Sequence, residues 1–228
     1  MTADESSGNS AALPPRFLET YPALEACPFV RATFLTRVPG VEVATDRATA
    51  LRRLEAPHRQ AAQAAGFTFD RLATAEQVHG ANIALVEAPG DFSGVDGLIS
   101  AQSNLPLGIY VADCGAVYLV DQRTHAIGLV HSGKKGTELG IVPAALAAMA
   151  QAFGTRPEDV TLQLAPCIRP PHYEVDFAAE ILRSARDLGV KDLHDCGRCT
   201  ASDATAYYSY RREKGQTGRM LALLEKQS

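Results

Sequence analysis

Hydrophobic residues in this chain gather into short runs that are separated by turn residues and by amphipathic stretches. Three such runs follow one another in the middle of the chain: Leu107–Ala112, Ala116–Val120 and Ala126–Val130. Short apolar runs that are rich in Val and Ile and bounded by Gly or polar residues are typical of buried strands. The pattern therefore predicts three core strands, with Cys114 between the first two and His131 directly after the third.

Similar patterns on both sides predict an alternation of strands and helices. Further strands are expected over Val30–Thr36, Leu72–Val78, Asn82–Val86, Gly97–Ile99 and Val160–Leu164. Helices are expected over Asp46–Ala65, with a kink at Pro57, and over Gly140–Phe153 and Asp176–Leu188. Asp46 and Asp176 are the expected N-caps. The segment Gly218–Leu224 fits a strand or a helix. With no repeat or long linker, we expect a single domain over residues 29–228, preceded by a flexible tail over residues 1–28.

Composition and charge narrow the class of protein. With 46% hydrophobic residues the chain can bury a large core, and a net charge of −4 gives no case for nucleic-acid or membrane partners. No apolar run approaches the roughly 20 residues that span a bilayer. The polar N-terminus does not have the pattern of a secretory signal. Five cysteines, an odd number, favour free thiols in a reducing compartment, and we expect the cytoplasm.

Three residues with metal-binding or nucleophilic side chains lie next to predicted strand ends, namely His79, Cys114 and His131. A His/Cys/His set suits a catalytic zinc, which takes three protein ligands and leaves a position for water or substrate. Two alternatives stay open from the residues alone. His131 could instead activate Cys114 as the nucleophile of a metal-free hydrolase, or these could be ordinary buried residues.

A basic segment follows the last of these residues. Lys134 and Lys135, between Gly133 and Gly136, could form a turn that holds an anion such as phosphate, or simply a solvated surface turn. Arg211 lies in a second cationic run and could contact an anionic group in the same way.

Several short motifs occur here in the order that they have in one known family. They are Gln77-Val-His79-Gly80, Ala112-Asp113-Cys114, His131-Ser-Gly133-Lys-Lys-Gly136, Ala165-Pro-Cys167-Ile, and Cys199-Thr200 followed by Ser209-Tyr-Arg-Arg212 and Thr217-Gly-Arg219. On these motifs the chain, from about Val30 to Leu224, resembles the YfiH-type laccase-domain family. This family is also labelled polyphenol oxidase-like, and it includes the FAMIN-type purine nucleoside phosphorylases.

The resemblance implies a fold and an activity. The fold would be α+β, a single domain in which two mixed β-sheets pack together with helices outside, an α/β/β/α sandwich. The activity would be zinc-dependent cleavage of adenosine, inosine or methylthioadenosine with phosphate, with adenosine deamination as a further activity. The partners would thus be a purine nucleoside and phosphate. Copper is less expected than zinc, because six scattered histidines cannot furnish a multicopper oxidase.

The resemblance also implies roles for individual residues. The metal ligands would be His79, Cys114 and His131, of which Cys114 and His131 would also be catalytic. Asp113 would be a proton acceptor or a structural carboxylate at the strand end. Gln77 would orient the first ligand or a substrate hydroxyl, and phosphate would lie against Lys135, with Arg37 or Arg211 assisting.

One departure from the family pattern affects the substrate pocket. The family usually has Trp-Arg where this chain has Lys134-Lys135, so an aromatic wall and a fork-shaped guanidinium are replaced. The departure keeps open a catalytically silent, metal-binding member that acts through protein partners.

Overall fold

The three central apolar runs form strands that belong to two different sheets. The structure, a computed structural model, describes residues 17–228 of the chain. Strand β7 (Leu107–Val111) lies in the first sheet, whereas β8 (Gly115–Asp121) and β9 (Ile127–Ser132) pair antiparallel in the second. The chain therefore crosses between the sheets over residues 112–114, and Cys114 lies in this crossing.

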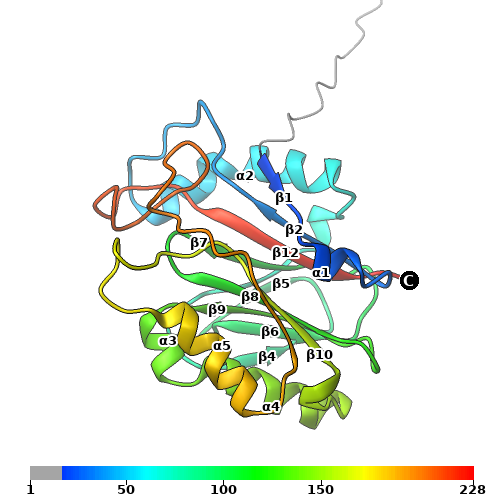
Figure 1. Cartoon of the computed structure of the whole chain (residues 1–228). Helices are drawn as coiled ribbons and strands as arrows, with labels where there is room; N and C mark the ends of the chain where they lie inside the picture. The colour runs from blue at the N-terminus through cyan, green and yellow to red at the C-terminus, as the bar shows by residue number, and fades with distance from the viewer. Residues whose placement is uncertain (1–16) are drawn as a thin grey trace, which may run out of the picture.

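Two mixed sheets of six strands each form the centre of the molecule within residues 17–228 (Figure 1). The first has the spatial order β1 (Leu18–Glu19), β2 (Val30–Leu35), β12 (Met220–Lys226), β7, β3 (Ala73–Ala75) and β5 (Gly90–Phe92). The second has the order β11 (Asp192–Asp195), β10 (Val160–Leu164), β8, β9, β6 (Gly97–Ser100) and β4 (Ile83–Leu85). Parallel pairing joins β3 to β7 and β5, β10 to β11, and β4 to β6; the other neighbours are antiparallel.

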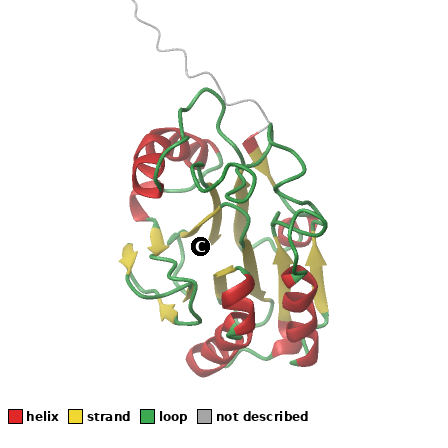
Figure 2. Cartoon of the chain, turned by 90° about the vertical axis from the view of Figure 1, so that its left-hand side faces the viewer, coloured by secondary structure: helices red, strands yellow, loops and turns green. Residues whose placement is uncertain are grey.

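Helices cover the outer faces of both sheets, as Figures 1 and 2 show from two directions. The longer ones are α2 (Arg47–Ala64), outside the first sheet, and α4 (Ile141–Phe153) and α5 (Phe177–Asp187), outside the second. The short ones are α1 (Pro22–Glu25), α3 (Lys134–Glu138) and the 3-10 turns Phe69–Arg71 and Pro157–Asp159. The expected α/β/β/α layers and α+β class are confirmed.

Alternation along each strand produces the separate apolar layers. In β8, Tyr118 points to the core between the sheets, whereas Val117 and Leu119 pack in the layer beneath α4 and α5. Successive side chains of a strand point to opposite faces, so one continuous apolar run can supply both layers. This explains why the central runs are hydrophobic throughout rather than at every second position.

The helix caps follow the sequence expectation. The side chain of Asp46 accepts the backbone N–H of Thr49 at 3.0 Å, and that of Asp176 accepts the N–H of Ala179 at 3.0 Å. Helix α2 continues through Pro57 as a single element. The segment Gly218–Leu224, whose pattern fitted a strand or a helix, contributes to a strand, β12. This strand pairs with β2 and β7 on either side in the first sheet.

Two expectations need correction. The strand expected over Leu72–Val78 is limited to Ala73–Ala75. The basic turn at Lys134 is the first turn of α3.

The domain also begins earlier than residue 29. Strand β1 pairs with β2, and Tyr21, Leu24 and Cys27 are buried in the core, so residues 17–28 are not a flexible tail. The rest of the expected tail, residues 1–16, lies outside the described residues. Among the helices of residues 17–228, none has the length and apolar character needed to cross a bilayer.

Candidate metal centre and cavity

The structure brings His79, Cys114 and His131 together from three separate elements. His79 lies in the connection between β3 and β4, Cys114 between β7 and β8, and His131 in β9. One ligand atom from each, a ring nitrogen or the Sγ, lies within 4.8 Å of the others. The two imidazole rings meet edge to face, with centroids 4.9 Å apart. Two imidazoles and a thiol converging at one point fit the donor preference of zinc.

The buried carboxylate of Asp96, which belongs to none of the sequence motifs, connects two of these residues. His131 Nδ1 lies 2.8 Å from Asp96 Oδ1, and both side chains are buried. A carboxylate only accepts, so Nδ1 carries the proton and Nε2 is left as the ligand atom. The same carboxylate accepts the backbone N–H groups of His79 at 2.8 Å and Gly80 at 2.7 Å. Asp96 thus orients one ring and holds the backbone that carries the other.

The backbone before His79 is held in an uncommon conformation. Gln77 and His79 have φ values of 67° and 60°, in the left-handed region. Beyond the end of β3, the Gln77 side-chain amide pairs with the backbone of Tyr110 in β7. It donates to the Tyr110 carbonyl at 2.5 Å and accepts the Tyr110 N–H at 3.0 Å. Gln77 lines the cavity, but both ends of its amide are engaged with the backbone of β7. It therefore positions the His79 turn.

The electrostatic environment favours a thiolate at Cys114. Burial opposes its ionisation, but the adjacent His131 and His79 rings outweigh burial and lower the pKa of the thiol. Burial likewise opposes the charged form of His131, and there Cys114 and Asp96 together raise its pKa above the usual value. A thiolate is the form of cysteine that binds a metal or acts as a nucleophile.

Asp113, next to the thiol, has both carboxylate oxygens engaged in hydrogen bonds with the protein. It is buried and has a φ of 85°. Its Oδ1 accepts the hydroxyl of Thr200 at 2.6 Å, and its Oδ2 accepts the hydroxyl of Ser209 at 3.1 Å and the N–H of Arg211 at 2.7 Å. The carboxylate thereby ties two distant loops to the end of β7. These contacts favour the structural reading of Asp113 over the proton acceptor.

The three candidate ligands line a cavity of about 770 Å³. Aromatic side chains contribute to its wall: Tyr110, Tyr173, Phe177 and Tyr210. An aromatic wall therefore exists even though the family's usual Trp is replaced by Lys. Aromatic rings of this kind offer flat apolar surfaces on which a planar ligand can stack.

Two of the expected substrate-binding residues, Lys135 and Arg211, also line the cavity. Lys135 lies in the first turn of α3. The guanidinium of Arg211 lies over the Tyr173 ring, 4.7 Å from its centroid, and pairs with Glu174 at 3.0 Å. Lys134, the other residue of the basic segment, pairs with Glu138 at 2.7 Å.

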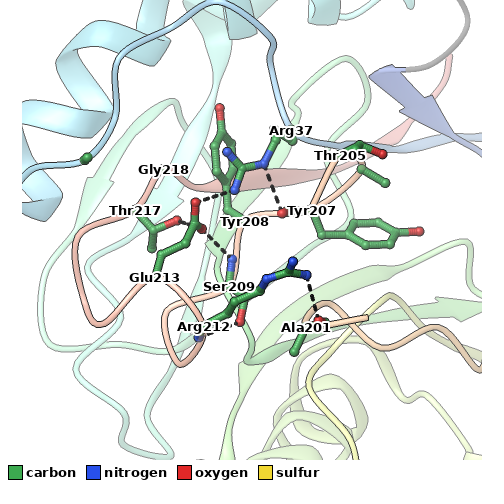
Figure 3. A network of polar contacts seen from close by, with 12 residues as sticks. Arg37, Ala201, Thr205, Tyr207, Tyr208, Ser209, Arg212, Glu213, Thr217 and Gly218 are labelled. Atoms are coloured by element: carbon green, nitrogen blue, oxygen red, sulfur yellow. Dashed lines mark hydrogen bonds and ion pairs between the residues drawn. The ribbon is translucent and has the colours of Figure 1, made fainter. Parts of the chain in front are cut away.

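Arg37 does not line this cavity. Its guanidinium pairs with Glu213, donates to the carbonyl of Tyr207 at 3.1 Å, and lies over the Tyr208 ring (Figure 3). These three contacts engage the guanidinium with the protein itself, and they favour a structural role over the expected role in phosphate binding. Arg37 holds the loop that follows residue 207.

Two cationic residues of the cavity had no assigned role, Arg47 and Arg219. Arg47 is the first residue of α2, and Arg219 immediately precedes β12. The sequence signal for Arg219 was its place in the Thr217-Gly-Arg219 motif; nothing local distinguished Arg47 from the other surface cations.

Comparison with known proteins identifies the family. The family model described as "Multi-copper polyphenol oxidoreductase laccase" matches residues 40–183 and 176–226. The chain belongs to this family. A relative from Deinococcus radiodurans, named purine nucleoside phosphorylase, is 34% identical over 224 residues, which cover 84% of this chain and 87% of the relative.

Solved structures agree on the fold. The crystal structure of the YfiH hypothetical protein from Bacillus licheniformis superposes with a TM-score of 0.77 at 20% identity, covering 86% of this chain and 92% of that one. The crystal structure of YlmD from Geobacillus stearothermophilus gives a TM-score of 0.76 at 24% identity, covering 94% of this chain and all of that one, 100%. The architecture of this family member is therefore the YfiH-like fold.

Proposed function

We propose that this family member is a zinc-dependent purine nucleoside phosphorylase that cleaves adenosine, inosine or methylthioadenosine with phosphate. The observation that carries the proposal is the convergence of His79, Cys114 and His131 at a cavity that also presents aromatic and cationic side chains. The relative from Deinococcus radiodurans, and a relative named YlmD at 29% identity, both bear the name purine nucleoside phosphorylase.

The residues of the cavity match the two parts of such a substrate pair. Tyr173, Phe177 and Tyr210 offer apolar surfaces for a purine base. Lys135 and Arg211 offer positive charge to phosphate. A zinc ion held by the His/Cys/His set would supply Lewis acidity toward a substrate oxygen or water.

Phosphorolysis then requires little covalent chemistry from the protein. A phosphate oxygen forms a bond to C1′ of the ribose as the bond from C1′ to the base nitrogen breaks. The base leaves with the electron pair of that bond and takes up a proton, and the products are ribose 1-phosphate and free base. The role of the cavity is to hold phosphate and nucleoside in line, which removes much of the entropic barrier. In the additional deamination, water would form a bond to C6 of adenosine as the bond from C6 to the amino nitrogen breaks, and the products would be inosine and ammonia.

Metal analysis combined with turnover tests the proposal. Metal content would be measured by mass spectrometry on the purified chain and on His79→Ala, Cys114→Ala and His131→Ala variants. His194→Ala, which alters a partly exposed histidine of β11, is the matched control. We expect near-stoichiometric zinc in wild type and control, loss of zinc in the three variants, and base release from inosine only when phosphate is present.

Other results would point to the alternatives. Turnover that survives chelation but is lost on alkylation would favour a Cys114–His131 hydrolase, since these two side chains are in contact range without a metal. Zinc without any turnover would favour a silent, metal-binding member. Copper in place of zinc would overturn the metal assignment. The five free thiols support the cytoplasm as the proposed location.

A further inference from the structure

Arg219 differs from the other cations of the cavity because it is buried, with 9% of its surface exposed. Its Nη1 donates to the carbonyls of Thr217 and Gly218, at 2.9 Å each. A guanidinium has five N–H donors, so these two bonds leave the three on Nε and Nη2 without an acceptor among residues 17–228. A buried cation with unused donors facing a cavity is the arrangement expected of a binding group.

A second guanidinium, that of Arg47, lines the same cavity. Arg47 donates to the carbonyl of Glu76 at 3.3 Å and forms no ion pair within the described part of the chain. The two guanidinium groups are close enough to repel one another: burial foremost, and then the charge of Arg47, lower the pKa of Arg219. The charges of Cys114 and Asp113 act on Arg219 in the opposite direction, but neither arginine forms an ion pair with a carboxylate within residues 17–228. Two guanidinium groups at one cavity, one exposed and one buried, favour binding of an anion between or beside them.

The neighbours of Arg219 hold it in place. The Thr217 hydroxyl donates to Glu213, which also pairs with Arg37 and accepts the N–H of Ser209 at 3.0 Å (Figure 3). The next residue, Gly218, packs so tightly on Tyr208 that a Cβ would lie 2.6 Å from ring carbons. The two carbonyls that accept from Arg219 therefore belong to a fixed backbone, and its free donors are pre-organised.

The remaining cations of the cavity lack this combination. Lys134 and Arg211 are exposed and paired with Glu138 and Glu174. Lys135 is exposed, on the first turn of a five-residue helix. An exposed ammonium makes a weaker and less directional contact to an oxyanion than a buried guanidinium.

We propose that Arg219, assisted by Arg47, binds one phosphate ion inside the cavity, and that this ion is the co-substrate of the reaction. The role of the ion as co-substrate rests on the proposed phosphorylase function, whereas the binding of phosphate by Arg219 does not depend on that function. Lys135 and Arg211 then attract the ion at the mouth of the cavity, and Arg219 holds it in the interior. The fork of the guanidinium matches two phosphate oxygens.

Direct binding of inorganic phosphate tests this without reference to turnover. Isothermal titration calorimetry would be run on the full, metal-loaded protein at constant ionic strength, with wild type, Arg219→Gln, Arg219→Lys and Arg47→Gln. Arg186→Gln, which removes an exposed charge on α5, is the matched control. We expect the Kd for phosphate to rise about 10- to 100-fold in Arg219→Gln, as is typical for lost hydrogen bonds to a charged group, and less in Arg47→Gln. The control should bind like wild type.

Arg219→Lys and Arg47→Gln keep the test decisive if Arg219→Gln does not fold. Lys keeps the charge but not the fork, so we expect weaker phosphate binding there as well. Wild-type affinity in Arg219→Lys and Arg47→Gln together would overturn the proposal. So would an Arg219-dependent affinity for adenosine 5′-monophosphate without affinity for free phosphate, because the ion would then belong to a nucleotide.

Turnover separates this proposal from the proposed function. If the chain is a phosphorylase, the KM for phosphate should rise in the Arg219 variants while the KM for inosine stays within about 3-fold. Arg219-dependent phosphate binding without base release would uphold the ion site and overturn the phosphorylase function. Phosphate-dependent base release with an unchanged KM for phosphate in the Arg219 variants would uphold the phosphorylase function and overturn the ion site.

Discussion

The Asp96 carboxylate lies 2.8 Å from His131 Nδ1, and both groups are buried at the join between strand β9 and the connection that carries His79. Burial opposes ionisation of Asp96, but the hydrogen bonds from His131 and from the amides of residues 79 and 80 outweigh it and lower the pKa of the carboxyl. A carboxylate that is hydrogen-bonded to a metal-binding imidazole fixes the orientation of the ring and raises the basicity of its other nitrogen.

Removing this charge should weaken the metal centre. In Asp96→Asn we expect the affinity for zinc to fall about 10- to 100-fold, because the negative charge beside His131 is lost and one of the two accepting oxygens becomes an NH₂ donor, which cannot accept the backbone N–H of Gly80. Competition with a chromogenic chelator would measure it. Asp187→Asn, an exposed change on α5, is the control. Unchanged zinc affinity in a folded Asp96→Asn protein would contradict a positioning role for Asp96.

Gly133 leaves room for the Cys114 thiol. A Cβ at this position would lie 2.5 Å from Cys114 Sγ, closer than such atoms approach. In Gly133→Ala we therefore expect the thiol to be displaced and the zinc content to fall, with the free energy of unfolding of the metal-free protein changed by less than about 2 kcal/mol. Gly136→Ala is the matched control, because its Cβ would meet nothing nearer than 3.4 Å. Equal zinc content in both variants would exclude this steric effect.

Asp113 should prove structural. In Asp113→Ala we expect the free energy of unfolding to fall by about 2–4 kcal/mol, because the Thr200 and Ser209 hydroxyls and the Arg211 amide lose their acceptor. Urea denaturation would measure this loss.

The conservative variant distinguishes this role from proton transfer. Asp113→Asn tolerates the positive φ and keeps one accepting oxygen. We expect it to retain the acidic limb of the pH profile of kcat/KM. Disappearance of that limb, without a matching loss of stability, would make Asp113 the proton acceptor instead.

His58, on the buried face of α2, should make stability depend on pH. Burial lowers its pKa from 6.5 to about 4, so the folded protein holds it neutral while the unfolded chain protonates it below pH 6.5. Its contribution is complete above pH 6.5 and is lost as pH falls toward 4. The loss corresponds to about 3 kcal/mol.

A difference measurement isolates this residue from the other titrating groups. The free energy of unfolding would be measured in urea at pH 7.5 and pH 4 for wild type, His58→Leu and the control His194→Gln, which alters a partly exposed histidine. We expect the acid destabilisation of His58→Leu to be smaller than that of wild type by about 3 kcal/mol, and that of the control to equal wild type. The same acid loss in all three would show that His58 does not set this dependence.

Local signals in the sequence were sufficient for much of the fold. The apolar runs around Leu119 and Leu129 predicted strands that exist, and Asp46 and Asp176 cap the helices expected of them. Such signals act between residues a few positions apart, so they can be read from the chain directly. Strand β1, of two residues, and helix α3, of five, escaped because they are too short to show a period.

The juxtaposition of His79, Cys114 and His131 was predicted from their places at strand ends and from the family motifs, and these two sources agreed. What the sequence by itself determined was therefore the type and order of most of the longer elements, and which three side chains are candidates for a metal site.

Only the tertiary structure decided which groups surround that chemistry. Asp96 contacts a residue 35 positions away, and Arg219 reaches a cavity whose other side is built from α2 and α3. Arg37, as cationic as Arg219 in the sequence, is instead neutralised by Glu213. The physical reason is that burial and the pairing of charges are set by how distant segments pack. A residue's own neighbours in the chain carry no record of that packing.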